Sequence, residues 1–280
     1  MKKILVAVSG GVDSIVLVDF LIDFFKQKNG LKWVEDNLII AHFEHGIRGK
    51  ESMRDFDFVR KFANENNLRF EFERGFLGEN ASEEKARKAR YDFLRALAER
   101  ENAEIFTAHH KNDLAETFVL NLNRGGGWRA TACFDSPNIK RPFLKFSKAE
   151  ILNKAQEKGL KWCEDSTNLS EKYARNRIRK KINFSEEDLN KIFEIWQKQI
   201  KIKREIEEIT NDILLKIGDG RKFERNFFRN NSDEVCMEFG TRRAQGMSAG
   251  NDGAYAAILG GCIGTANCLA EMKYGPDVKA

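Results

Sequence analysis

The feature that most constrains the fold lies at the start of the chain, where a short apolar run meets a pair of glycines. Residues Ile4–Val8 are apolar and rich in β-branched side chains, which predicts a buried parallel strand. Gly10 and Gly11 predict a turn, and Ile15–Phe25 carries a helical apolar face. A strand that turns directly into a helix is the opening unit of an open α/β sheet, which needs further strands and covering helices.

Strand and helix patterns alternate through the following residues. Further strands are predicted at Leu38–His42, Leu68–Glu73 and Glu104–Ala108. Helices are predicted at Arg54–Asn66, Ser82–Glu101, Asp113–Leu122 and Ser147–Gly159. The aperiodic stretch 125–139 predicts a loop, and Asn183–Lys216 predicts a long charged helix broken near Ser185. The order predicts the α/β class: a doubly wound parallel sheet followed by a helical segment and a Gly/Ala-rich tail.

Composition divides the 280 residues into three predicted parts: 1–182, 183–228 and 229–280. The last part holds eight glycines and eight alanines, and its fold is not predicted by any pattern. It carries five Lys and Arg against six Asp and Glu, so the chain's net charge of +5 belongs to the first 228 residues. An excess of positive charge there is compatible with a polyanionic partner.

Cysteine usage and hydropathy limit the compartment. The five cysteines form no C-x-x-C pair and are odd in number, which indicates free thiols in a reducing compartment. The first residues lack a signal-peptide pattern, and no apolar run reaches the length of a membrane span. We therefore expect a cytoplasmic protein with no membrane partner.

The turn after the first strand has the composition of a phosphate-binding loop. Its six residues are Ser9, Gly10, Gly11, Val12, Asp13 and Ser14. Glycines allow the backbone to approach a phosphate, and amides at a helix start favour an anion. The two serine hydroxyls are suited to donate to phosphate oxygens, whereas Asp13 is suited to hold a Mg²⁺ that bridges phosphates. The alternative is an ordinary Gly-rich turn between strand and helix.

Two pairs of charged residues share helix faces. Arg87 and Arg90 lie three residues apart, and paired guanidiniums suit the phosphates of ATP or tRNA. Asp113 and Glu116 are spaced likewise, and paired carboxylates suit a lysine ammonium or Mg²⁺. The alternatives are a solvated basic face and exposed acids at a helix N-terminus.

Histidines and a basic cluster complete the candidate residues. His109 and His110 follow the fourth predicted strand, where open α/β sheets bind ligands, so one of them is suited to orient a phosphate while the other packs. Arg175, Arg177 and Arg179 are suited to neutralise phosphates of tRNA or ATP, with an ordinary basic surface turn as the alternative.

The loop Ser9–Ser14, with the sequence S-G-G-V-D-S, resembles the PP-loop of the ATP-pyrophosphatases, which cleave ATP between the α and β phosphates. Further segments, in order and spacing, resemble the tRNA(Ile)-lysidine synthetases, most clearly over 1–182 and more weakly to about 228. These segments are Glu44–Arg48, Glu84–Arg87, Thr107–His110, Arg141–Leu144, Glu164–Asn168 and Arg175–Arg179.

This resemblance implies adenylation of the wobble cytidine of tRNA(Ile) with a CAU anticodon, followed by attachment of lysine and release of AMP and pyrophosphate. It implies ATP and Mg²⁺ as cofactors, tRNA(Ile) and L-lysine as partners, and a possible homodimer. The implied catalytic residues are Asp13, Arg87, Arg90, Asp113 and Glu116. The implied nucleotide-binding residues are the six of the loop with His45, His109 and Arg175, and Asp13 is the implied metal ligand.

The chain departs from the family pattern at three places. Asn112 stands where the family usually shows an acid, which predicts weaker binding of metal or lysine. Ala130-Thr131 replaces a typical Gly-Leu, and the family's C-terminal tRNA-binding region is shortened. The tail at about 232–280 resembles an internal fragment of nicotinate phosphoribosyltransferases, but it is too short to form their barrel, so a chimeric origin is the favoured interpretation.

Two alternatives to the ligase function remain open from the sequence. One is a PP-loop tRNA thiolase, a chemistry that usually needs a cysteine pair, here represented only by the distant Cys133 and Cys163. The other is a nucleotide-binding chimera whose altered C-terminus impairs or abolishes catalysis.

Overall fold

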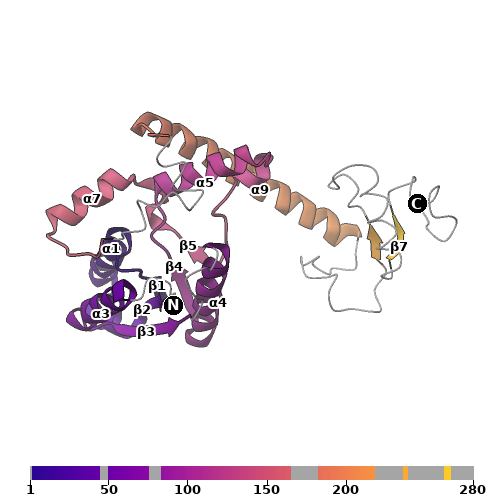
Figure 1. Ribbon diagram of the computed structural model, residues 1–280. Coiled ribbons are helices and arrows are strands. Elements are labelled where there is room, and N and C mark those ends of the chain that lie inside the picture. The colour runs from indigo at the N-terminus through magenta and orange to yellow at the C-terminus, as the bar shows by residue number, and fades with distance from the viewer. Residues whose placement is uncertain are drawn as a thin grey trace. The chain divides into compact units, whose positions relative to one another are not determined.

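A five-stranded parallel sheet forms the centre of the N-terminal part (Figure 1). The computed structural model describes residues 2–44, 50–75, 83–164, 182–217, 236–238 and 262–265. The strand order is β3-β2-β1-β4-β5, which confirms the predicted doubly wound parallel sheet. The strands are β1 (Lys3–Ala7), β2 (Leu38–Glu44), β3 (Arg69–Arg74), β4 (Ala103–Phe106) and β5 (Ile139–Lys140).

The helices follow the predicted alternation with three additions. They are α1 (Val12–Asn29), α2 (Leu31–Asn37), α3 (Lys50–Glu65), α4 (Glu83–Glu101), α5 (Lys111–Asn123), α6 (Trp128–Thr131), the 3₁₀ helix η1 (Pro142–Lys145), α7 (Lys148–Glu157) and α9 (Glu186–Ile217). The loop prediction for 125–139 was wrong in part, because it contains α6 and ends on the first residue of β5. Elements of two to four residues are too short to show a periodic pattern.

The two faces of the sheet have separate cores. Ile4 and Val6 of β1 point to the face covered by α1, α3 and α7, and all these apolar contacts belong to one buried cluster. Leu5, between them, points to the opposite face, where it packs with Leu94 and Leu97 of α4. This alternation follows from the pleat of a strand, in which successive side chains point to opposite faces. Burial on both faces explains why β1 and β2 are apolar throughout.

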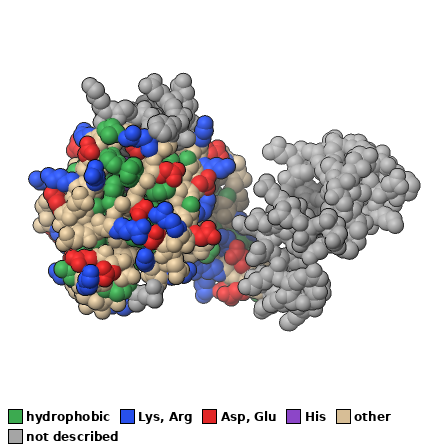
Figure 2. Space-filling model, turned by 90° about the horizontal axis from the view of Figure 1, so that it is seen from below, with side chains coloured by type: hydrophobic (Ala, Val, Ile, Leu, Met, Phe, Trp, Pro, Cys, Tyr) green, Lys and Arg blue, Asp and Glu red, His purple; other side chains and the backbone are tan. Residues whose placement is uncertain are grey.

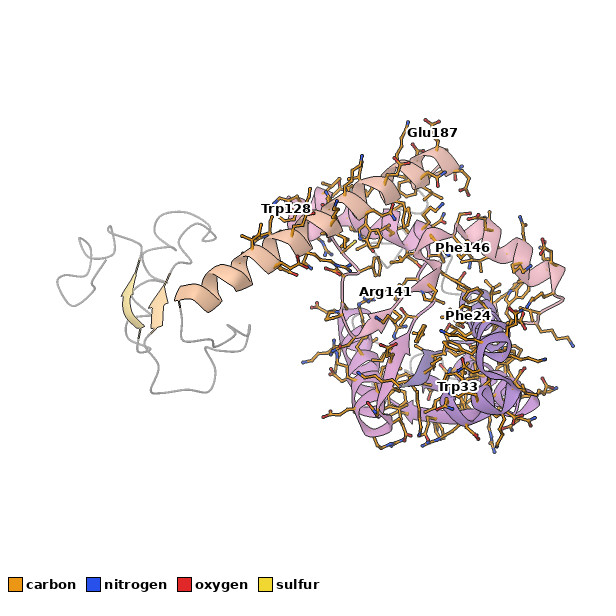
Figure 3. The ribbon with its side chains drawn as sticks, turned by 180° about the vertical axis from the view of Figure 1, so that it is seen from behind. Phe24, Trp33, Trp128, Arg141, Phe146 and Glu187 are labelled. Carbon is orange, nitrogen blue, oxygen red and sulfur yellow. The ribbon has the colours of Figure 1, made fainter. Side chains whose placement is uncertain are left out.

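Aromatic packing attaches the short helix α2 to α1. The ring of Phe25 lies 5.0 Å from that of Phe24 and 5.1 Å from that of Trp33, measured between centroids (Figure 3). Gly30 joins the two helices with φ at +89°, a conformation that glycine adopts without steric cost. α2 was not predicted, because its seven residues are too few to show a clear helical period.

The first part of α9 packs on the N-terminal part of the chain. The indole Nε1 of Trp196 donates to the Cys133 carbonyl at 2.7 Å, and Lys203 and Arg204 contact Asp135 at 2.9 and 3.1 Å. Ser185 caps the helix, since its hydroxyl accepts from the Asp188 amide at 3.1 Å, so the predicted break is the helix start.

Two compact units divide the chain, Met1–Glu207 and Glu208–Ala280. In the second, the described strands β6 (Cys236–Glu238) and β7 (Cys262–Thr265) form a parallel pair. The predicted three-part division at 182 and 228 stays a prediction. Within the described residues, no helix combines the length and apolar character needed to cross a membrane.

Acidic and basic side chains interleave over the described surface in view in Figure 2, around patches of hydrophobic side chains. Among the described residues, charged side chains also form ion pairs. Arg69 contacts both Glu71 and Glu101, and Arg100 contacts the same two carboxylates. On this face, therefore, the excess positive charge of the first 228 residues is not collected into one basic patch.

The turn between β1 and α1 depends on Gly10. Its φ is +95°, and a Cβ at this position would lie 3.3 Å from Val59 Cγ2 and 3.8 Å from the Asp55 carbonyl oxygen. The Gly10 carbonyl also accepts a hydrogen bond from the Cys163 amide at 2.9 Å. The turn is therefore clamped between α3 and the segment that follows α7.

We predict that Gly10→Ala destabilises the fold by about 2 kcal/mol, because alanine is strained at this φ and also meets Val59. Gly30→Ala is the matched control, since Gly30 has a similar φ and nothing within 4 Å of the added Cβ. Urea unfolding of both variants measures the difference. Equal losses of unfolding free energy would show that the contact with Val59 contributes nothing.

Candidate functional site

A cleft of about 350 Å³ opens at the carboxyl ends of β1, β2 and β4. β1 and its following turn contribute Ser9, Asp13 and Ser14, which belong to the predicted phosphate loop. The chain runs from β1 outward to β3 and then crosses back to β4, so the cleft lies at the switch point of the strand order. Open α/β sheets bind ligands at this position, because the loops on either side diverge there.

The phosphate loop is held by its own side chains. The Ser14 hydroxyl donates to the Gly11 carbonyl at 2.8 Å, and the hydroxyls of Ser9 and Ser14 lie 3.4 Å apart. Gly11 is the N-cap of α1 and has no side chain to cap the helix. The amides of the first turn, including those of Val12 and Asp13, therefore point into a region suited to an external anion.

Asp13 meets a cation that the sequence did not single out. The ammonium Nζ of Lys148 lies 2.7 Å from Asp13 Oδ1 and 2.8 Å from Oδ2. The Nε2 atom of His110 lies 3.8 Å from Oδ1 of the same carboxylate. Asp13 thus occupies a position where a positive charge is stabilised, which fits its predicted role at a metal ion. Mg²⁺ in phosphate sites needs only one or two carboxylates, with phosphate oxygens and water as further ligands.

Helix α4 brings three aromatic and basic side chains together. The guanidinium groups of Arg87 and Arg90 lie 4.9 and 5.3 Å from the ring centroid of Tyr91. Arg90 lines the cleft, whereas Arg87 lies outside its lining. Burial raises the pKa of the Tyr91 hydroxyl, but the charges of Arg87, Arg90 and Arg141 outweigh this effect and lower it. The lowered pKa reports a strongly positive field at this side of the cleft.

Arg141 adds a third guanidinium, at the point where the chain leaves β5 and enters η1 (Figure 3). It donates to the Phe134 carbonyl at 2.6 Å and stacks over the Phe134 ring at 5.2 Å. Burial lowers the pKa of the guanidinium, since water that would solvate the charge is excluded. The sequence signal was its place in the R-P-F-L segment.

His109 is neutral in this environment. Burial lowers the pKa of its imidazole to about 3, against a smaller opposing effect of Asp113, and the charges of Arg141, Arg90 and Arg87 lower it further. Its Nδ1 lies 2.9 Å from the Thr107 hydroxyl, and its ring centroid lies 4.9 Å from that of Phe134. His109 lines the cleft and can therefore donate or accept a hydrogen bond there without carrying charge.

His110 instead organises the start of α5. Its Nδ1 accepts from the Asp113 amide at 3.4 Å, while its own amide donates to Asp113 Oδ2 at 3.0 Å, which forms a capping box. Because Nδ1 is an acceptor, the proton of the neutral ring lies on Nε2, which faces Asp13. The structure thus separates the two histidines into one that lines the cleft and one that packs, while the predicted orienting of a phosphate stays a prediction.

The predicted acidic pair is not brought together on the cleft. Asp113 lines it, with 16% of its side chain exposed. Glu116, one turn further along α5, is 2% exposed and lies outside the cleft lining. Of the two carboxylates, Asp113 is therefore the one that lines the cleft.

Asn112 has a structural role that its replacement of an acid in the family pattern did not predict. Its Oδ1 accepts from the Lys148 amide at 2.9 Å, and the Lys111 amide donates to the Phe146 carbonyl at 2.8 Å. These two bonds join the start of α5 to the start of α7. Any effect of Asn112 on metal or lysine binding stays a prediction.

Several polar residues of the cleft were not predicted as site residues, among them His42, Glu44, Ser52 and Asp55. The His42 Nδ1–H group donates to the Val8 carbonyl at 2.9 Å, and Glu44 pairs with Arg74 at 2.7 Å. Ser52 and Asp55 approach from α3, and all four are at most 8% exposed. Buried polar side chains at the end of an otherwise apolar strand were the available signal, seen at His42 and Glu44. His45 and Arg175 lie outside the described residues.

The parallel sheet, the glycine turn and the cleft at the strand ends define the class: an α/β protein with an anion-binding loop at the switch point. The profile of the PP-loop domain, an ATP-binding domain, matches residues 1–186. The chain belongs to this family.

Individual relatives are tRNA(Ile)-lysidine synthases. The protein of Thermotoga sp. (strain RQ2) is 38% identical over 190 residues, which are 65% of this chain and 44% of the relative. That of Rickettsia bellii (strain OSU 85-389) is 32% identical, with 74% and 48% covered, and that of Thermosipho africanus is 37% identical, with 86% and 57% covered. The chain thus spans about half the length of the curated relatives it matches. The resemblance of the tail to nicotinate phosphoribosyltransferases has no support among them.

A solved structure shares the fold. The U34-tRNA thiolase NcsA from Methanococcus maripaludis, determined with its [4Fe-4S] cluster, superimposes with a TM-score of 0.57 at 19% identity. The similarity covers 71% of this chain and 73% of the thiolase. At this level of identity the match supports the fold alone.

The His109 pKa generates a prediction about stability and pH. The unfolded imidazole takes up a proton below its ordinary pKa of about 6.5, whereas the folded one does not until about 3, so stability falls as pH falls through this window. We expect the wild type to lose about 1 kcal/mol more than His109→Gln between pH 7.5 and pH 5.5. Urea unfolding at both values measures this. A pH-independent difference between the two proteins would contradict the neutral assignment of the folded imidazole.

Proposed function

We propose that this chain is a tRNA-modifying ligase, which adenylates the wobble cytidine of tRNA(Ile) with a CAU anticodon and then attaches L-lysine to it. The observation that carries the proposal is the cleft itself, because phosphate-loop residues, Arg90, His109 and Asp113 line one cavity at the switch point of the sheet. The 32–38% identity to tRNA(Ile)-lysidine synthases, over 190 to 256 residues, supports the substrate assignment. The reaction belongs in the cytoplasm, where tRNA and ATP are available.

The first step is the attack of the cytidine 2-oxygen on the α-phosphorus of ATP. A bond forms between this oxygen and phosphorus, while the bond to the bridging oxygen breaks and its electron pair leaves with pyrophosphate. The amides at the start of α1 and the hydroxyls of Ser9 and Ser14 hold the phosphates. Asp13 would hold Mg²⁺, which neutralises charge on the phosphate oxygens. Arg90 stabilises the negative charge that develops on the far side of the cleft, and Arg87, which lies with it at the Tyr91 ring, adds to the positive field there.

The second step places lysine next to the activated base. The lysine amine attacks the ring carbon that bears the adenylate, and AMP departs with the electron pair of the broken carbon–oxygen bond. Asp113 is the carboxylate that α5 contributes to the lining of the cleft. We propose that it binds an ammonium group of the lysine substrate. The attacking amine must lose a proton, and the assignment of that proton's acceptor stays open between His109 and a carboxylate.

The thiolase alternative is disfavoured by the cysteine near the loop. Burial, together with the adjoining Asp55 carboxylate, raises the pKa of the Cys163 thiol to about 11. A thiol with this pKa is almost fully protonated at neutral pH and is a poor nucleophile. Transfer of sulfur to tRNA by the purified protein would support the thiolase in place of the ligase.

The non-catalytic alternative draws on the length of the chain, which spans about half of its relatives. It predicts that ATP binds but that lysine is not transferred. Incubation with ATP, radiolabelled lysine and unmodified tRNA(Ile) separates the cases, because only the ligase makes labelled tRNA. ATP binding without label would favour the impaired chimera, and failure to bind ATP would contradict both.

We predict that Asp13→Asn lowers tRNA-dependent pyrophosphate release about 100-fold, because the variant keeps the shape but removes the charge that holds the metal. Asp19→Asn on the same helix is the control, since Asp19 pairs with Lys158 away from the cleft. Phosphate-coupled detection of pyrophosphate measures both. Unchanged release in Asp13→Asn would remove Asp13 from the site.

We also predict that Arg90→Ala and Arg87→Ala each lower this turnover by about tenfold or more, as loss of a charged hydrogen-bond donor does. Lys88→Ala is the matched control, because Lys88 is an exposed cation on the same helix. A loss in Lys88→Ala equal to that of the arginine variants would indicate a general charge effect rather than contact with substrate.

A further inference from the structure

The ion pair between Lys148 and Asp13 has no explanation in the packing of helix α7. Lys148 is the first residue of α7, where the helix dipole disfavours a cation. Ser147 and Glu150 already form a complete capping box at this end, with bonds of 3.4 and 2.6 Å. The lysine therefore does not serve the helix, and its ammonium instead extends to a carboxylate 135 residues away in sequence.

The position of Lys148 is set by the neighbouring helix. Its amide is held by Asn112 at 2.9 Å, and the bond between Lys111 and Phe146 fixes the preceding turn. The starts of α5 and α7 are thereby tied together beside the start of α1, which carries Asp13. Both oxygens of Asp13 lie within 2.8 Å of the ammonium, although 35% of the lysine side chain is exposed.

From this geometry we propose that Lys148 is a phosphate-binding residue that exchanges partners when the nucleotide arrives. In the nucleotide-free protein it neutralises Asp13. When Asp13 takes a divalent cation, the ammonium moves to the oxygens of the β and γ phosphates, the group that leaves as pyrophosphate. This inference rests on the proposed function, and it adds the residue that neutralises the negative charge of the leaving pyrophosphate.

The exchange is physically reasonable because each charge keeps a partner. Two cations compete for one carboxylate, so Lys148 must leave at least one Asp13 oxygen when a divalent ion binds. The loop that binds phosphates contains Asp13 itself, so the released ammonium needs to travel only a few ångströms. Lysine presents a point charge on a flexible four-carbon stem, which suits such a movement better than the rigid fork of arginine.

Two binding measurements on the full chain test the proposal without relying on catalysis. Titration with inorganic pyrophosphate in the presence of Mg²⁺ should show about tenfold weaker binding for Lys148→Met than for the wild type. Titration of the nucleotide-free protein with Mg²⁺ alone should show binding several-fold tighter for the same variant, because the competing ammonium is gone. A residue that only supports the fold would not move the two affinities in opposite directions.

Lys154→Met is the matched control, because Lys154 lies on the same helix and pairs with the exposed Glu157. Lys148→Arg keeps the charge and should keep pyrophosphate binding within a few-fold of the wild type, which guards against misfolding of the methionine variant. Equal pyrophosphate affinity in Lys148→Met and the wild type would overturn the inference alone. A wild type that binds neither ATP nor pyrophosphate would overturn the proposed function and the inference together.

Discussion

The close approach of backbone to backbone at Gly10 is the constraint on which the site depends. Its left-handed conformation helps to turn the chain from β1 into α1 within the four residues 8–11, and its carbonyl accepts a hydrogen bond from the Cys163 amide. β1 is the central strand, so the elements that line the cleft lie on both sides of this turn. A side chain there would push α3 away and would displace the amides that face the anion site.

The electrostatics of the cleft divide it into two sides. Toward α1 and α7, the carboxylate of Asp13 is balanced by Lys148 and faced by His110. Toward α4 and β5, the field is positive enough to lower the pKa of Tyr91 and to help keep His109 neutral. An arrangement with a cation-holding carboxylate on one side and guanidiniums on the other suits a polyphosphate that lies between them.

Most of the fold followed from local patterns. β1, β2 and the helices α1, α3, α4, α5 and α7 were predicted because buried strands and amphipathic helices impose periods of two and 3.6 residues on the sequence. The two-residue strand β5 and the seven-residue helix α2 were missed, because so few residues show no clear strand or helix period. The predicted pairing of Asp113 with Glu116 is not seen on the cleft, since helix spacing gives a shared face but not which neighbour that face meets.

The sequence by itself determined the phosphate loop, its place between a strand and a helix, and the class of sheet, because glycines and apolar periodicity act over a few residues. Only the tertiary structure decided which polar side chains meet there. Lys148 lies 135 residues from Asp13 in the chain, and no local pattern records their contact. It arises because parallel strands bring distant loops to one edge of the sheet, and because Asn112 fixes the helix that carries the lysine.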